Sequence, residues 1–75
     1  MAGPGERGQV RGAFEDLTRP EERRHGVYLI RVEGEDRHSA SVTGAYETAR
    51  RLARRKTAFG NVTLSFGYEV DTPAL

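Results

Sequence analysis

The sequence predicts a small single α+β domain with a β-β-α-β core, in which one main helix packs on one face of a three-stranded, at least partly antiparallel sheet. Three observations lead to this prediction. Residues 27–42 and 62–70 alternate apolar and polar side chains, as strands covered on one face do. Residues 45–53 carry alanine and leucine at helical spacing. The length of 75 residues allows one domain with a limited core.

The first 12 residues hold four glycines and one proline and few apolar groups, which predicts a flexible tail over 1–12 before a single domain over 13–72. Val10 with Phe14 is compatible with a short added edge strand.

Pro20 with two following glutamates favours a short N-terminal helical turn at about 20–25, which Gly26 would end. Phe14 and Leu17 are expected to anchor this segment to the core.

A hairpin is predicted next. Tyr28, Ile30 and Val32 alternate with more polar neighbours, and Gly34 supplies a positive φ in the turn "EGED". On the return strand, Ala40 and Val42 would face the core, and the opposite side would carry Arg37, Ser39 and Ser41.

The main helix is expected to begin at Thr43 as N-cap, with Glu47 in its first turn, and to end near residues 56–58. Its apolar stripe is Ala45, Ala49, Leu52 and Ala53. Phe59 is expected in the core. The closing strand alternates most clearly, with Val62, Leu64, Phe66, Tyr68 and Val70 predicted to face the core, and it is a candidate edge strand.

Four arginines of the helix, Arg50, Arg51, Arg54 and Arg55, are predicted to fall together opposite the apolar stripe. They form either an ordinary solvated helix face or a face that binds phosphate or an acidic partner, since arginine makes bidentate contacts with phosphate. No interleaved aromatic residue for base stacking accompanies them.

The uncovered sheet face is the second candidate surface. We expect it to carry Leu29, Arg31, Arg37, Thr63 and Ser65, and to be either plainly solvated or a self-association face. An RNA-binding sheet would place aromatic side chains there, whereas Tyr28, Phe66 and Tyr68 are predicted on the core side.

Several functions find no support in the residue types. The chain has no cysteine, and neither His25 nor His38 has metal-ligand spacing. No nucleophile set, acid–base pair or phosphate-binding glycine loop occurs, so we expect no enzyme, no cofactor and no small-molecule substrate. No apolar run could span a bilayer and no signal sequence begins the chain, which favours the cytoplasm.

The net charge of +1 is too balanced for a general polyanion binder. Of the 12 basic residues, 11 are arginine, a bias that, with the abundant alanine and glycine, suggests a bacterial or phage origin.

The order of hairpin, helix and closing strand over residues 27–64 resembles small bacterial β-β-α-β modules and, more loosely, arm-site DNA-binding domains of phage integrases. The resemblance lies in Thr43, Ala45, Ala49, Leu52 and Ala53, covers half of the chain and carries no functional residue across.

The sequence thus predicts a small non-enzymatic binding or regulatory module, homodimeric and acting through protein–protein contacts. The alternative is a nucleic-acid-binding protein whose arginine-rich helix face contacts phosphates.

Overall fold

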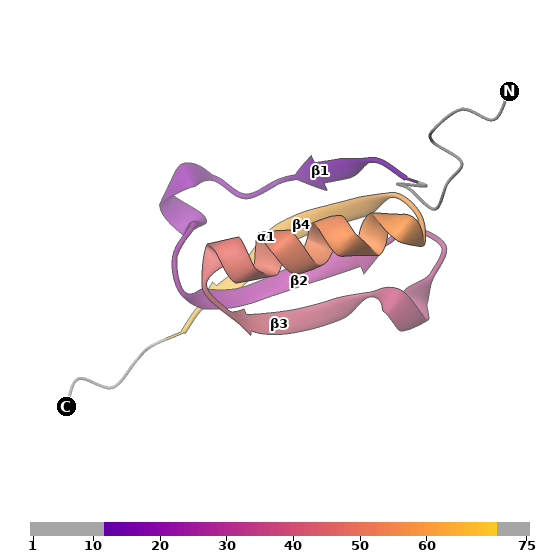
Figure 1. The fold of residues 1–75 in the computed structure, drawn as a ribbon. Coiled ribbons are helices and arrows are strands. Elements are labelled where there is room, and N and C mark those ends of the chain that lie inside the picture. The colour runs from indigo at the N-terminus through magenta and orange to yellow at the C-terminus, as the bar shows by residue number, and fades with distance from the viewer. Residues whose placement is uncertain (1–11, 71–75) are drawn as a thin grey trace, which may run out of the picture.

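The computed structural model describes residues 12–70 and shows one helix packed across a four-stranded mixed sheet (Figure 1). The strands and the helix, in chain order, are β1 (Phe14–Asp16), β2 (Gly26–Val32), β3 (Ala40–Gly44), α1 (Tyr46–Arg55) and β4 (Val62–Glu69). Short 3-10 turns span Pro20–Glu22, Asp36–His38 and Lys56–Ala58. The α+β class is confirmed, and the sheet has one strand more than predicted.

The extra strand is β1, and it changes which strands lie at the edges. The sheet order is β1-β4-β2-β3, with β2 antiparallel to β3 and β4, and β1 parallel to β4. The Val62 amide donates to the Ala13 carbonyl at 2.8 Å, and the Leu17 amide to the Leu64 carbonyl at 2.8 Å. The expectation that β4 is an edge strand is therefore wrong, because β1, from the start of the described chain, pairs with its outer side.

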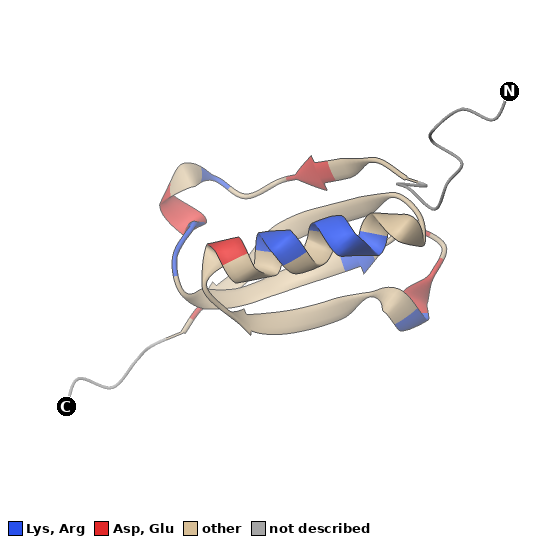
Figure 2. Cartoon of the chain, in the orientation of Figure 1, with Lys and Arg blue, Asp and Glu red and all other residues tan. Residues whose placement is uncertain are grey.

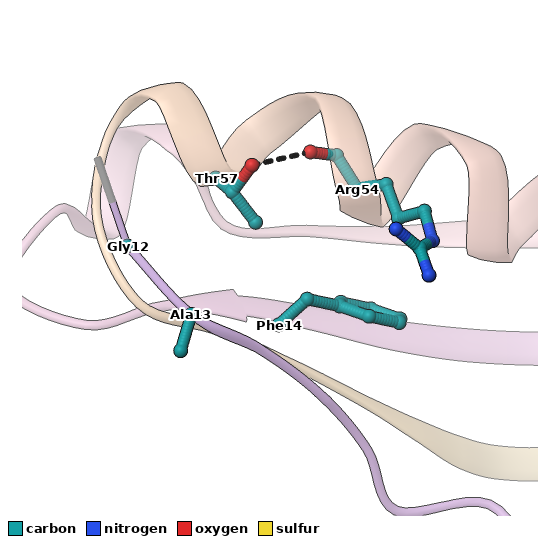
Figure 3. A pocket seen from close by; sticks show the side chains of 5 residues that line it. All are labelled: Gly12, Ala13, Phe14, Arg54 and Thr57. Carbon is teal, nitrogen blue, oxygen red and sulfur yellow. Dashed lines mark hydrogen bonds between the residues drawn. The ribbon is translucent and has the colours of Figure 1, made fainter. Parts of the chain in front are cut away.

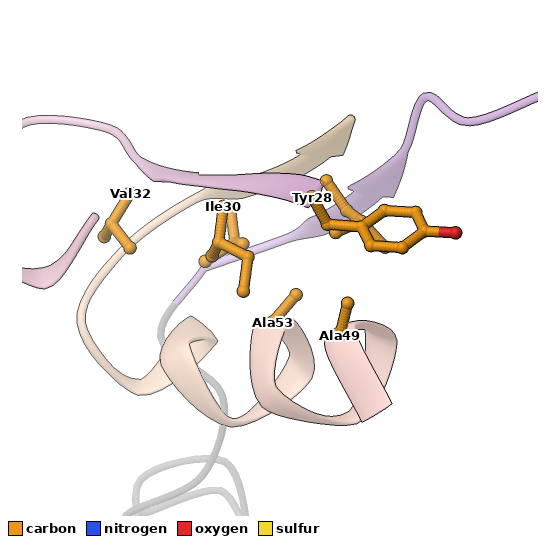
Figure 4. Close-up of a cluster of buried hydrophobic side chains, with 7 residues drawn as sticks. Tyr28, Ile30, Val32, Ala49 and Ala53 are labelled. Atoms are coloured by element: carbon orange, nitrogen blue, oxygen red, sulfur yellow. The ribbon is translucent and has the colours of Figure 1, made fainter. Parts of the chain in front are cut away.

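The core lies between β2, β4 and the helix. Figure 4 shows Tyr28, Ile30 and Val32 pointing from β2 toward Ala49 and Ala53 of α1. The two alanines are 1% and 0% exposed. Since alanine side chains are small, the helix axis can come close to the sheet, and the larger strand residues fill the space. The predicted apolar stripe is confirmed at these two positions.

A β-bulge interrupts the pairing of β2 with β4. Tyr28 is paired with Phe66, but Val27 is paired with Tyr68, so Gly67 has no counterpart on β2. An extra residue in one strand shifts the alternation of the following side chains by one position. Tyr68 consequently leaves the core side and is 63% exposed. The prediction of a core-facing Tyr68 was wrong for this reason.

Two further apolar residues that were predicted to contact the core are exposed instead. Leu17 is 53% exposed, beyond the end of β1. Phe59 is 46% exposed and stacks on the His38 ring, with ring centres 3.8 Å apart and planes 5° apart. Phe14, by contrast, packs against the core as expected.

The helix begins later than predicted. Thr43 belongs to β3, and Ala45 occupies the N-cap position without a side-chain cap hydrogen bond. Glu47 does lie in the first turn. Gly34 has the positive φ, 78°, that was expected in the hairpin turn.

The predicted tail reaches into the fold at its last residue, because the Gly12 amide donates to the Thr57 carbonyl at 3.0 Å. The rest of that predicted tail, Val10 and the predicted domain end at 71–72 lie outside the described residues.

Candidate functional site

The arginines of α1 do not form one uniform face. Basic residues follow the acidic first turn along the helix (Figure 2). Arg50 turns to β1, where its Nε lies 4.0 Å from Asp16 Oδ2. The guanidinium carbon of Arg54 lies 5.2 Å from the centre of the Phe14 ring. Arg51 and Arg55 are exposed and form no ion pair with any residue of 12–70.

Asp16 is the centre of a polar cluster between β1 and α1. Its Oδ1 accepts hydrogen bonds from the Thr18 amide (2.9 Å) and hydroxyl (2.6 Å), and its Oδ2 accepts one from the Tyr46 hydroxyl. Arg23 lies over the Tyr46 ring at 5.2 Å and donates from Nε to the Thr18 hydroxyl at 3.2 Å. Sequence reasoning missed this cluster, because 30 positions separate Asp16 from Tyr46 and only the parallel pairing of β1 brings them together.

The protonation of the cluster follows from its hydrogen bonds. Burial alone would raise the pKa of Asp16, but the hydrogen bonds from Thr18 and Tyr46 hold that pKa below its usual value. Burial, and then the hydrogen bond to Asp16, raises the pKa of Tyr46. At neutral pH the pair is thus a carboxylate and a neutral phenol, which is a stable tie between two elements.

Tyr28 is satisfied in the same way. Its single hydroxyl proton is shared between the backbone carbonyls of Glu22 and Arg24, which both accept from it, and burial raises the pKa of Tyr28. Within the described part of the chain no buried side-chain polar atom lacks a partner. The hydroxyls of Tyr28 and Tyr46 and the carboxylate of Asp16 therefore have a structural role, since each has hydrogen-bond partners within the fold.

Among residues 12–70, no helix packs on the opposite face of the sheet (Figure 1). Strand pairing arranges its side chains in three rows across the strands: Glu15–Thr63–Arg31, Ser65–Leu29–Ser41 and Tyr68–Val27–Thr43. Leu29 is 43% exposed. The two rows that include a residue of β3, those of Leu29 and Val27, contain no charged residue. Apart from Tyr68, their polar side chains are the small hydroxyls of serine and threonine. We call these three rows the open face.

The open face holds four of the five residues predicted for it, namely Leu29, Arg31, Thr63 and Ser65. Arg37 is the exception, since it lies in the 3-10 turn before β3. The Val32 amide donates to the Ser39 hydroxyl at 2.9 Å in place of a strand partner, so the chain joins the sheet only at Ala40. Ser39 nevertheless lines a hollow together with Leu29, Arg31 and Ser41.

Two of the hollows on the described surface lie next to the candidate residues. The one in Figure 3, with a volume of about 330 Å³, is lined by Gly12, Ala13, Phe14, Arg54 and Thr57. The Thr57 hydroxyl donates to the Arg54 carbonyl at 2.6 Å, and the Arg54 guanidinium lies over Phe14, so the polar groups of this hollow are engaged within the fold. The second hollow is open and lies on the open face near Arg31 and Asp36.

No metal-binding group of histidine and acidic side chains is found among residues 12–70. Within the same residues, no helix is long and apolar enough to cross a membrane. Neither family models, curated proteins nor solved structures give a significant match to this chain.

Proposed function

We propose that this protein is a small non-enzymatic binding module that acts through protein–protein contacts and associates with a second copy of itself through its sheet. One observation carries the proposal: the open face and the outer edge of β3 have no cover among the described residues. Leu29 and Tyr68 are exposed there, and the two rows that hold them contain no charged residue.

The composition of this surface supports protein contact over plain solvation. A solvated face usually bears lysine and glutamate, whereas protein interfaces have few charges in their centre and are enriched in aromatic residues. Within the three rows, the charged residues are Glu15 and Arg31, which lie away from Tyr68. Asp36 adds a charge at the hollow beside Leu29 and Arg31. The surrounding hydroxyls can form hydrogen bonds at a polar rim.

The size of the core supports self-association as well. The buried apolar cluster has seven residues, and two of them are alanine. A core this small supplies little stability by itself, and binding of a second folded copy stabilises the native state by mass action.

Sedimentation of the full chain over a wide range of concentrations tests the proposal. We expect the mass to rise from the monomer value of 8.3 kDa toward twice that value. The double variant Arg51→Glu/Arg55→Glu is the control, since those side chains lie on α1 away from the open face, and it should associate equally. A monomer at every concentration would overturn the proposal.

A second candidate function, nucleic-acid binding, is favoured by one observation: Arg51, Arg54 and Arg55 are exposed on α1. The engagement of Arg50 with Asp16 reduces the patch that would contact phosphates.

A further inference from the structure

β3 differs from the other edge of the sheet in having no protection against pairing with another chain. Exposed edge strands usually carry charged residues or proline, or are very short. β1 has three residues, two of them acidic. β3 has five residues, Ala-Ser-Val-Thr-Gly, without charge or proline. It is thus the place where a further strand can add most readily.

The strand pairing shows which backbone groups of β3 point outward. Successive residues of a strand direct their N–H and C=O groups to opposite sides. The backbone groups of Val62 and Leu64 point to β1, so the backbone groups of Thr63 and Ser65 point to β2.

On β2, Arg31 is opposite Thr63 and Leu29 is opposite Ser65, so the backbone groups of Arg31 and Leu29 point to β4. The backbone groups of Tyr28 and Ile30 therefore point to β3. Because Tyr28 is opposite Val42 and Ile30 is opposite Ala40, the groups of Ser41 and Thr43 point away from the sheet.

We propose that a second copy of this chain pairs antiparallel along β3 about a twofold axis at Val42, so that Ser41 of each copy is opposite Thr43 of the other. The outward amide and carbonyl groups of both residues then find partners across the axis. The inference rests on the proposed function and specifies its contact. The two sheets become continuous, and their open faces form one larger surface with Leu29 and Tyr68 still accessible.

A second copy fits this edge because the edge is complementary to itself. Ser41 and Thr43 are placed symmetrically about Val42 and are uncharged, so antiparallel pairing opposes no like charges. Arg37 comes five positions before Val42 and Glu47 five positions after it, and both are exposed. Pairing about Val42 therefore brings Arg37 of one copy to the same end as Glu47 of the other.

A cysteine scan along β3 tests the pairing and its register. The chain has no cysteine, so one introduced thiol can be joined only to the same thiol of another copy. In the proposed register, Val42 of one copy and Val42 of the other form a non-hydrogen-bonded pair. Their Cα atoms are about 4.5 Å apart, a separation that a disulfide can bridge. Under mild oxidation in non-reducing electrophoresis, Val42→Cys should give a covalent dimer.

Ser41→Cys and Thr43→Cys are the matched controls, one position away on the same strand. Each faces the other residue across the axis, so two identical thiols are offset by two residues along the strand and by the spacing between the strands. Their Cα atoms are then about 8 Å apart on the diagonal, beyond the roughly 7 Å that a disulfide spans. We expect little covalent dimer from either. Equal cross-linking at all three positions, or strong cross-linking only at a control, would overturn the pairing about Val42.

A charge exchange tests the same register without oxidation. Ser41→Lys/Thr43→Lys opposes like charges across the axis twice, whereas Ser41→Lys/Thr43→Glu opposes lysine to glutamate twice. Both side chains are exposed, and circular dichroism establishes that the variants fold. We expect the lysine–glutamate variant to dimerise at least about tenfold more tightly than the double-lysine variant. Equal dissociation constants would contradict the pairing.

A third variant, Leu29→Ser/Tyr68→Ser, separates failure of the inference from failure of the proposed function. It alters the open face and leaves β3 unchanged, so the edge dimer should persist. A dimer that is lost in this variant and unchanged in both charge variants would reject the β3 pairing and keep self-association through the face. A wild-type protein that stays monomeric would reject both.

Discussion

Asp16 is a charged residue whose contacts connect β1 to the helix. Its side chain is 17% exposed and holds groups from three places, namely the backbone and hydroxyl of Thr18, the hydroxyl of Tyr46 and, at longer range, Arg50. β1 is short, and these contacts fasten it to the helix. The Arg50 side chain is thereby directed toward β1 and away from the exposed side of α1 that carries Arg51 and Arg55.

Asp16→Asn should lower the free energy of unfolding by about 1–2 kcal/mol at neutral pH, because hydrogen bonds to a charged acceptor are replaced by weaker ones. The folded-state pKa of Asp16 is below the ordinary value of 3.8. The contribution of the carboxylate is therefore complete above that ordinary pKa and is lost as pH falls through the lower folded-state pKa.

Urea unfolding at a series of pH values checks this prediction. The difference between the wild type and Asp16→Asn should shrink as the solution becomes strongly acidic. Glu15→Gln is the control, since Glu15 is exposed on the other side of the same strand, and should change stability little at any pH. A difference that does not vary with pH would show that the charge of Asp16 has no part in it.

At the scale of single elements, close approach of backbones decides the geometry. Gly26, at the start of β2, lies where a Cβ atom would be 2.5 Å from the Phe66 ring and 2.8 Å from the Tyr68 carbonyl oxygen. These neighbours flank the Gly67 bulge, so the bulge and the small residue opposite it belong together. The exposure of Tyr68 depends on this arrangement.

Gly26→Ala should lower the free energy of unfolding by about 1–3 kcal/mol, because the added methyl group forces the backbone of β4 to move. Gly44→Ala is a close control: Gly44 is the strand partner of Gly26 on β3, and a Cβ atom there meets nothing within 4 Å. We expect it to leave stability unchanged or to raise it by up to about 1 kcal/mol. Denaturant unfolding measures both, and equal effects would show that the contact with Phe66 is unimportant.

The helix rests on the sheet through alanine, and a larger residue should disturb it. Ala53→Leu is expected to cost about 1–3 kcal/mol, since the site is fully buried and well packed. Arg51→Leu places the same side chain on the exposed side of α1 and should change stability by no more than about 0.5 kcal/mol. Thermal or denaturant unfolding compares the two, and a tolerated Ala53→Leu would mean that the helix can shift away from β2.

At the scale of the whole molecule, the two surfaces suggest different partners. The outer side of α1 is basic, and the open face is uncharged near β3. If Arg51 and Arg55 contact phosphates, the logarithm of the affinity for a short duplex should fall with the logarithm of salt by about 0.9 for each contact, hence by nearly 2. Fluorescence anisotropy of a labelled duplex measures this slope.

We expect no such slope, because the structure leaves only part of the arginine set exposed and the proposed contact lies elsewhere. Arg51→Glu/Arg55→Glu is the comparison: a salt-dependent affinity in the wild type that this variant loses would favour nucleic-acid binding over self-association as the function.

The sequence by itself determined the α+β class, the hairpin, the helix and the closing strand, because these depend on local periodicity and on turn residues such as Gly34. It also placed Leu29, Arg31, Thr63 and Ser65 on one face, since alternation along a strand requires no knowledge of the neighbours. The buried Ala49 and Ala53 followed from helical spacing in the same way.

Only the tertiary structure decided the rest. Pairing between segments far apart in the chain made β1 a strand, moved β4 into the sheet and left β3 at its edge. A bulge at one glycine turned Tyr68 outward, and Asp16 drew one arginine of α1 into the fold. The local pattern was compatible with a short edge strand at Phe14 but predicted none of the other features, because strand order and register are set by contacts that only the folded chain brings together.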